Sequence, residues 1–80
     1  MATFLAERYW PGVTPAAVGA ETARLRETGA RVLDATVADG DEVCFWYIEA
    51  GSPADVRASF AAAGVTVDRI GPARRVAGVE

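Results

Sequence analysis

The stretch that decides the fold is Glu42–Pro53, EVCFWYIEAGSP, because a strong strand signal is followed in it by a strong helix start. Its first half is rich in β-branched and aromatic side chains, which favour the pleated surface of a sheet. Ser52 then precedes a proline, and this pair is typical of a helix N-terminus, since the hydroxyl accepts hydrogen bonds from free backbone N–H groups and proline lacks an N–H. The stretch therefore predicts a strand over 42–49 and a helix over 53–63.

The same signals recur upstream. Thr14-Pro15 predicts a helix over 15–28, and Gly29 and Gly64 supply the left-handed residue with which helices commonly end. Asp39-Gly40 favours a tight hairpin turn. The remaining segments carry strand-type residues, so the predicted strands are 3–9, 30–37, 42–49 and 65–70, with Val76 as the farthest end of the last.

The resulting order, β-α-β-β-α-β, predicts an α+β chain with the ferredoxin-like split β-α-β arrangement, as one domain over 1–80. In this arrangement a four-stranded antiparallel sheet carries both helices on one face. The other face is then exposed to solvent, covered by a partner or used to bind a ligand.

The composition excludes several kinds of catalytic and metal site. The 80 residues carry a net charge of −3, one cysteine and no histidine, which excludes Ser-His-Asp and Cys-His catalysis and imidazole-based zinc sites within one chain. Cys44 lies in an apolar run and is interpreted as a small core residue. The N-terminus lacks the basic region of a signal peptide and no stretch is long enough to span a membrane, so we expect a cytoplasmic protein. The acidic balance does not favour nucleic acid.

Alternation along the strands predicts which side chains share the open face. A charge in mid-sheet is costly to bury, so Glu7 is placed there together with Leu5 and Tyr9. The third strand leaves two assignments open, of which the face with Phe45, Tyr47 and Glu49 is the better outward one. Two nearby carboxylates can raise one pKa and provide a general acid or base. The candidates are catalytic Glu7, Glu49 and Tyr47, and ligand-binding Leu5, Tyr9, Asp34 and Phe45.

Several short motifs resemble a family of small ferredoxin-like proteins of unassigned function, typified by an actinobacterial nickel-binding protein. They are Phe4-Leu5-Ala6-Glu7-Arg8 with Pro11-Gly12, Glu49-Ala50 with Ser52-Pro53, Ala63-Gly64, and Asp68-Arg69-Ile70. The resemblance implies a homodimeric α/β-barrel, in which two sheets meet face to face and enclose a cavity. Where many relatives carry a Cys and a His, this chain has Trp46 and Ser59. Nickel prefers thiolate and imidazole ligands, so no cofactor is expected here.

The leading hypothesis is a homodimer that binds a small organic molecule on the open face, with cofactor-free isomerase, cyclase or dehydratase chemistry left open. One alternative is a nickel-binding or other divalent-metal-responsive protein, with Glu7, Asp34 and Glu49 as oxygen ligands. An RNA-binding module, a regulatory amino-acid-binding domain and a purely structural dimer are the others. Arg24 and Arg26 are interpreted as part of a solvated helix face, and Arg74 and Arg75 as a solvated tail.

Overall fold

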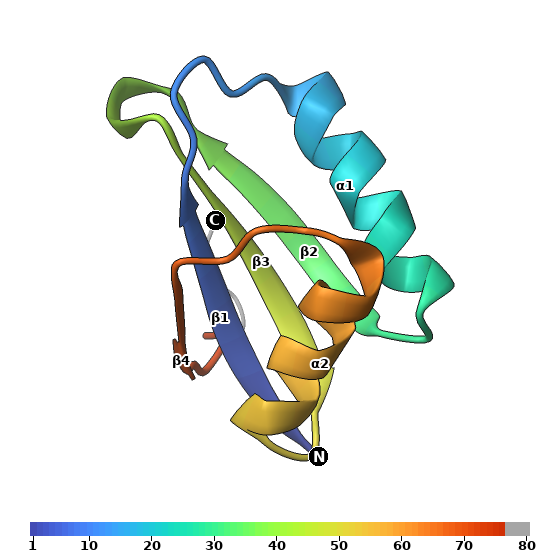
Figure 1. Cartoon of the computed structure of the whole chain (residues 1–80). Helices are drawn as coiled ribbons and strands as arrows, with labels where there is room; N and C mark the ends of the chain where they lie inside the picture. Colours follow the sequence, from blue (N-terminus) through green and yellow to red (C-terminus); the bar gives the residue numbers. More distant parts are fainter. Residues whose placement is uncertain (77–80) are drawn as a thin grey trace.

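The computed structural model describes residues 1–76 and has the α+β architecture that the sequence predicts. The strands form one antiparallel sheet in the order β2-β3-β1-β4, and both helices lie on the same face of it (Figure 1). Within the described residues, no helix has the length and apolar character needed to cross a membrane. In chain order the elements are β1 (Ala2–Tyr9), α1 (Pro15–Glu27), β2 (Arg31–Ala38), the 3-10 turn η1 (Asp39–Asp41), β3 (Val43–Ala50), α2 (Pro53–Ala63) and β4 (Arg69–Pro72).

Both helices begin where the sequence predicts. The Thr14 hydroxyl accepts from the N–H of Ala17 at 3.1 Å, and the Ser52 hydroxyl accepts from the N–H of Asp55 at 3.2 Å. Each cap satisfies one of the backbone donors that the first helical turn leaves unpaired. At the other end of α2, Gly64 has a φ of 67°, in the left-handed region that the absence of a Cβ makes accessible.

The core lies between the sheet and the helices, and Trp46 of β3 joins its parts. Trp46 is fully buried, packs edge-on against Phe60 of α2 at 5.3 Å between ring centroids, and donates its indole N–H to the Thr22 hydroxyl of α1 at 3.0 Å. Cys44 is buried on the same face, as predicted, and this burial raises the pKa of its thiol. One side chain therefore ties both helices to the central strand.

The last strand is shorter than predicted and begins four residues later, at Arg69. Residues 65–67 instead cross from α2 back to the sheet: Val65 is buried in the core, and its N–H donates to the carbonyl of Phe60 at 2.9 Å. Backbone contact with β1 starts at Asp68, which donates its N–H to the Glu7 carbonyl at 2.8 Å. The apolar residues of this stretch, which led to the strand prediction, instead pack into the core or against it.

The link between β2 and β3 also differs from the prediction. Instead of a tight Asp-Gly turn, η1 is followed by Glu42 in the left-handed region, with a φ of 54°. Two bonds hold this conformation: Trp10 donates its N–H to the Glu42 carbonyl, and Gly12 donates its N–H to the Glu42 carboxylate, each at 2.7 Å. These bonds to the β1–α1 loop let a non-glycine residue occupy a region that costs a side chain free energy.

Candidate functional site

The structure resolves which side of β3 faces away from the helices. Cys44, Trp46 and Ile48 are all buried beneath the helices, and the residues that alternate with them are only partly buried. Because successive side chains of a strand point to opposite faces, Phe45 and Tyr47 project from the open face. The assignment that the sequence favoured is therefore confirmed.

The strand register arranges the open face in rows that run across the sheet. In the middle row, Leu5 of β1 lies opposite Tyr47 of β3, and Tyr47 lies opposite Asp34 of β2. Directly opposed side chains on one face lie within contact distance of each other. The row therefore places a carboxylate, a phenol and an aliphatic side chain side by side, and this is the part of the predicted site that the fold assembles.

The two neighbouring rows have mixed charge. On one side of the middle row, Phe45 lies between Glu7 of β1 and Thr36 of β2, and Glu7 also lies opposite Arg69 of β4. On the other side, Glu49 lies opposite Arg31, with 3.3 Å between the carboxylate and the guanidinium Nε. Within residues 1–76, the open face thus combines an apolar centre with acidic and basic groups around it.

The predicted cluster of two carboxylates does not form. Glu49 lies opposite Thr3, which is four positions from Glu7 along β1, a separation of about 13 Å at the usual rise of a strand. The register therefore does not bring the two carboxylates together as a pair. Tyr9 is also outside the central row, because it lies opposite Val43 at the end of the sheet and is 61% exposed.

The segment after β4 crosses the open face, where a solvated tail was predicted for Arg75. Ala73 donates its N–H to the Thr3 carbonyl at 3.0 Å. Arg75 then lies 3.5 Å from the Asp34 carboxylate, with its guanidinium carbon 5.3 Å from the centre of the Tyr47 ring. No local pattern predicts this contact, because adjacent arginines near a terminus carry no periodicity that fixes their direction. Arg75 therefore belongs with the middle row.

Metal ligation was the alternative use of the same carboxylates. Within residues 1–76, no group of three or more Asp, Glu, Cys or His side chains comes together in a way that could hold a metal ion. Asp34 has two other contacts, since one carboxylate oxygen accepts from the Ala35 N–H at 2.8 Å and the other faces Arg75.

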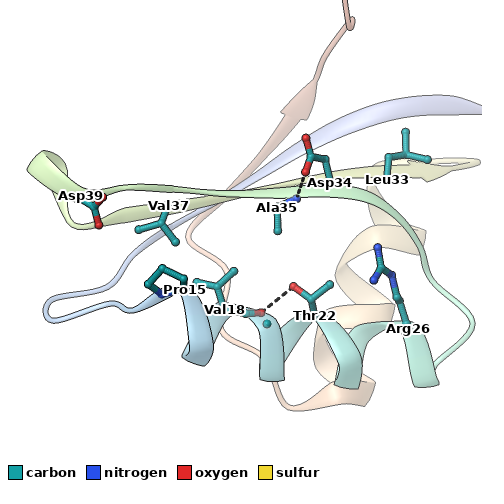
Figure 2. Close-up of a pocket in the computed structure, with 10 residues that line it drawn as sticks. Pro15, Val18, Thr22, Arg26, Leu33, Asp34, Ala35, Val37 and Asp39 are labelled. Carbon is teal, nitrogen blue, oxygen red and sulfur yellow. Dashed lines mark hydrogen bonds between the residues drawn. The ribbon is translucent and has the colours of Figure 1, made fainter.

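A second concave feature, which the sequence reasoning missed, lies between α1 and the edge strand β2. This groove has a volume of about 510 Å³. Figure 2 shows that Ala35 and Val37 of β2 point toward α1, whereas Leu33 and Asp34 point away from it. Leu33 and Asp34 are neighbours that share a side because the strand register shifts between Val32 and Asp34. The groove lining consists of Pro15, Val18, Gly19, Thr22, Arg26, Leu33, Asp34, Ala35, Val37 and Asp39.

Comparison with protein-family models, curated proteins and solved structures found no match for this chain. The family resemblance of its short motifs therefore stays a prediction.

Proposed function

We propose that this chain forms a homodimer through its open sheet faces and binds a small cyclic or aromatic organic molecule between them. The observation that carries the proposal is the middle row, in which Leu5, Tyr47 and Asp34 lie side by side with Arg75 above the ring. Small-molecule sites typically combine apolar and aromatic walls with a few polar groups that orient the ligand. The middle row has this composition.

Partial exposure of apolar side chains supports the homodimer. Leu5 and Phe45 lie near the centre of the open face and stay only half-buried in a single chain. A domain of this length buries only about 60% to 65% of the surface that its unfolded chain exposes, less than a larger domain does, and gains stability by covering such a face. A second copy of the sheet offers the same apolar centre and the same mixture of charges.

Two polar groups of the middle row, the Arg75 guanidinium and the Tyr47 hydroxyl, can each bind a different kind of ligand atom. Arg75 lies at the ring of Tyr47 and half of its side chain is exposed, so its guanidinium is placed to meet a carboxylate or a polarised carbonyl. The Tyr47 hydroxyl both donates and accepts hydrogen bonds. Both groups therefore favour a ligand that has an acidic or ketonic substituent on a ring.

A proton-transfer role falls to Glu7 rather than to Glu49. Glu49 is paired with Arg31, whereas Glu7 has no ion-pair partner within 4.0 Å among residues 1–76. Glu7 adjoins the aromatic wall through Phe45, its register partner. If the bound molecule is turned over, Glu7 is the carboxylate that is positioned to move a proton without a cofactor.

A thermal-shift screen tests the binding proposal. Metal-stripped protein is heated with ring carboxylates and ketones, and separately with divalent metals. We expect a ring compound to raise the melting temperature of the parent chain and of Tyr9→Ala, a matched control outside the middle row, but not that of Tyr47→Ala. Stabilisation by metals alone, or equal stabilisation of both variants, contradicts the proposal.

Sedimentation equilibrium tests the dimer separately. The parent chain should sediment as a dimer at micromolar concentration, and Phe45→Glu should shift it to a monomer, because a charge is placed at the apolar centre of the covered face. A parent chain that sediments as a monomer throughout the range contradicts the dimer.

A further inference from the structure

We propose that the groove between α1 and β2 binds an extended peptide segment of a partner protein, which adds to the sheet as a fifth strand antiparallel to β2. β2 is an edge strand, since the sheet order places only β3 beside it. A helix alongside an exposed sheet edge is a recurrent setting for peptide recognition, in which main-chain bonds give affinity and pockets select side chains. Nothing in this proposal depends on the open face.

The outer edge of β2 offers backbone groups to such a segment. Ala35 donates its N–H to the Asp34 carboxylate, which marks its backbone groups as facing the outer edge. Alternation along the strand places the N–H and C=O of Val37 on the same outer side. The Val32 carbonyl is already capped by Arg26 at 2.9 Å. The groups available to a partner are therefore those toward the Asp39 end.

Gly19 keeps the groove open. It lies in the middle of α1, and a Cβ added there meets nothing within 4 Å, so no packing contact requires a glycine. Glycine is among the poorest helix formers. Gly19 lines the groove, so the absence of a side chain there keeps the space between α1 and the side chains of Val37 and Ala35 open. This is the second observation, independent of the free edge, that points to an occupant.

The length of the groove and its charges define the occupant. From Pro15 to Arg26 the helix rises about 16 Å, which matches about five residues of extended chain. Arg26 lies at one end and Asp39 at the other, with Val18, Ala35 and Val37 between them (Figure 2). β2 runs from the Arg26 end to the Asp39 end, so an antiparallel segment carries its basic residue first and its acidic residue last. Small apolar side chains at alternate positions face α1.

A lone segment fits this place better than a second copy of the chain. α1 lies along the outer side of the sheet beside β2 (Figure 1). A second copy that paired edge to edge through its own β2 would bring its own α1 into the groove next to the α1 of this chain, so the two helices would conflict. A peptide without a covering helix has no such conflict, so edge-to-edge self-association is an outcome that the test must separate.

The test titrates a fluorescent heptapeptide, Lys-Val-Thr-Val-Thr-Val-Glu, against the parent chain and records amide shifts of the labelled protein. We expect the amides of Gly19 and Val37 to shift, and the reversed sequence to bind about tenfold more weakly. Gly19→Leu fills the groove and should weaken binding at least about tenfold. Ala20→Leu, an exposed change on α1 outside the groove lining, should bind as the parent does.

A charge exchange keeps the test decisive if Gly19→Leu fails to fold. The double variant Arg26→Glu and Asp39→Lys alters only exposed side chains and should prefer the reversed peptide. The proposal is overturned if neither peptide shifts the groove amides, or if the charge exchange leaves the preference unchanged. Self-association of the parent that Gly19→Leu abolishes would also overturn it, in favour of a second copy.

Discussion

The contact between Arg75 and Asp34 provides a measurable test of how the segment after β4 lies on the open face. We consider Arg75→Gln, which removes the charge and keeps a polar side chain. At 3.5 Å two unit charges attract by about 1.2 kcal/mol in bulk water, but exposed pairs contribute only about 0.2 to 1 kcal/mol in measured cycles. Because half of each side chain is exposed, the range of about 0.2 to 1 kcal/mol for exposed pairs applies here.

The stacking of Arg75 on Tyr47 adds a second contribution. An exposed cation above an aromatic ring contributes about 0.5 to 1 kcal/mol. Arg75→Gln should therefore lower the free energy of unfolding by about 1 kcal/mol, which for a domain of this size shifts the melting temperature by about 4 to 8 °C. Arg75→Lys should lose less, because it keeps the charge without the planar group.

A double-mutant cycle isolates the ion pair. Asp34→Asn removes the charge and leaves an amide oxygen that can still accept from the Ala35 N–H. Urea unfolding of the two single variants and the double variant should give a coupling of about 0.2 to 1 kcal/mol at low salt, reduced at about 1 M NaCl, where screening acts within about 3 Å. A coupling of zero at low salt, or one that salt does not reduce, would refute the placement of Arg75.

Three further predictions test the fold that supports the site. Trp46→Phe should lower the free energy of unfolding by about 2 kcal/mol in urea, because it removes the bond to Thr22 and part of a buried ring; a loss below about 0.5 kcal/mol would contradict this packing. Glu42→Gly should be about 1 kcal/mol more stable than Glu42→Ala, because glycine relieves the φ of 54°, and equal midpoints would contradict that reasoning. Burial raises the pKa of the Cys44 thiol, so the unfolded chain ionises first and stability should fall as pH rises above the ordinary value of 9.0; a Cys44→Ala variant with the same alkaline loss would argue against it.

Local signals in the sequence were sufficient to predict where the helices begin and which side chains share a face of β3. Thr14 and Ser52 each precede a proline, and both caps are present at those residues. Alternation predicted that Phe45, Tyr47 and Glu49 share one face of β3 but left two assignments open, and the burial of Cys44, Trp46 and Ile48 in the structure decided between them. The helix caps and the alternation along β3 depend on residues that are close together in the chain, which is why a single sequence is enough to predict them.

The composition of the site depended on contacts that are distant in sequence. The spacing along each strand could not predict that Glu7 meets Phe45 rather than Glu49, because register is set by the pairing of strands far apart in the chain. The same holds for Arg75 and Asp34, which are 41 residues apart. The groove was missed because it lies between two elements, each of which looked ordinary by itself.

The central claim is that ligand binding occurs on the open sheet face, at the row that contains Tyr47. The chain has only two tyrosines, so isotope labelling of tyrosine rings gives one signal in the row and one, from Tyr9, at the end of the sheet. A ring compound that stabilises the protein should shift the Tyr47 ring resonances strongly and those of Tyr9 weakly. A stabilising compound that leaves the Tyr47 resonances unmoved would contradict the account.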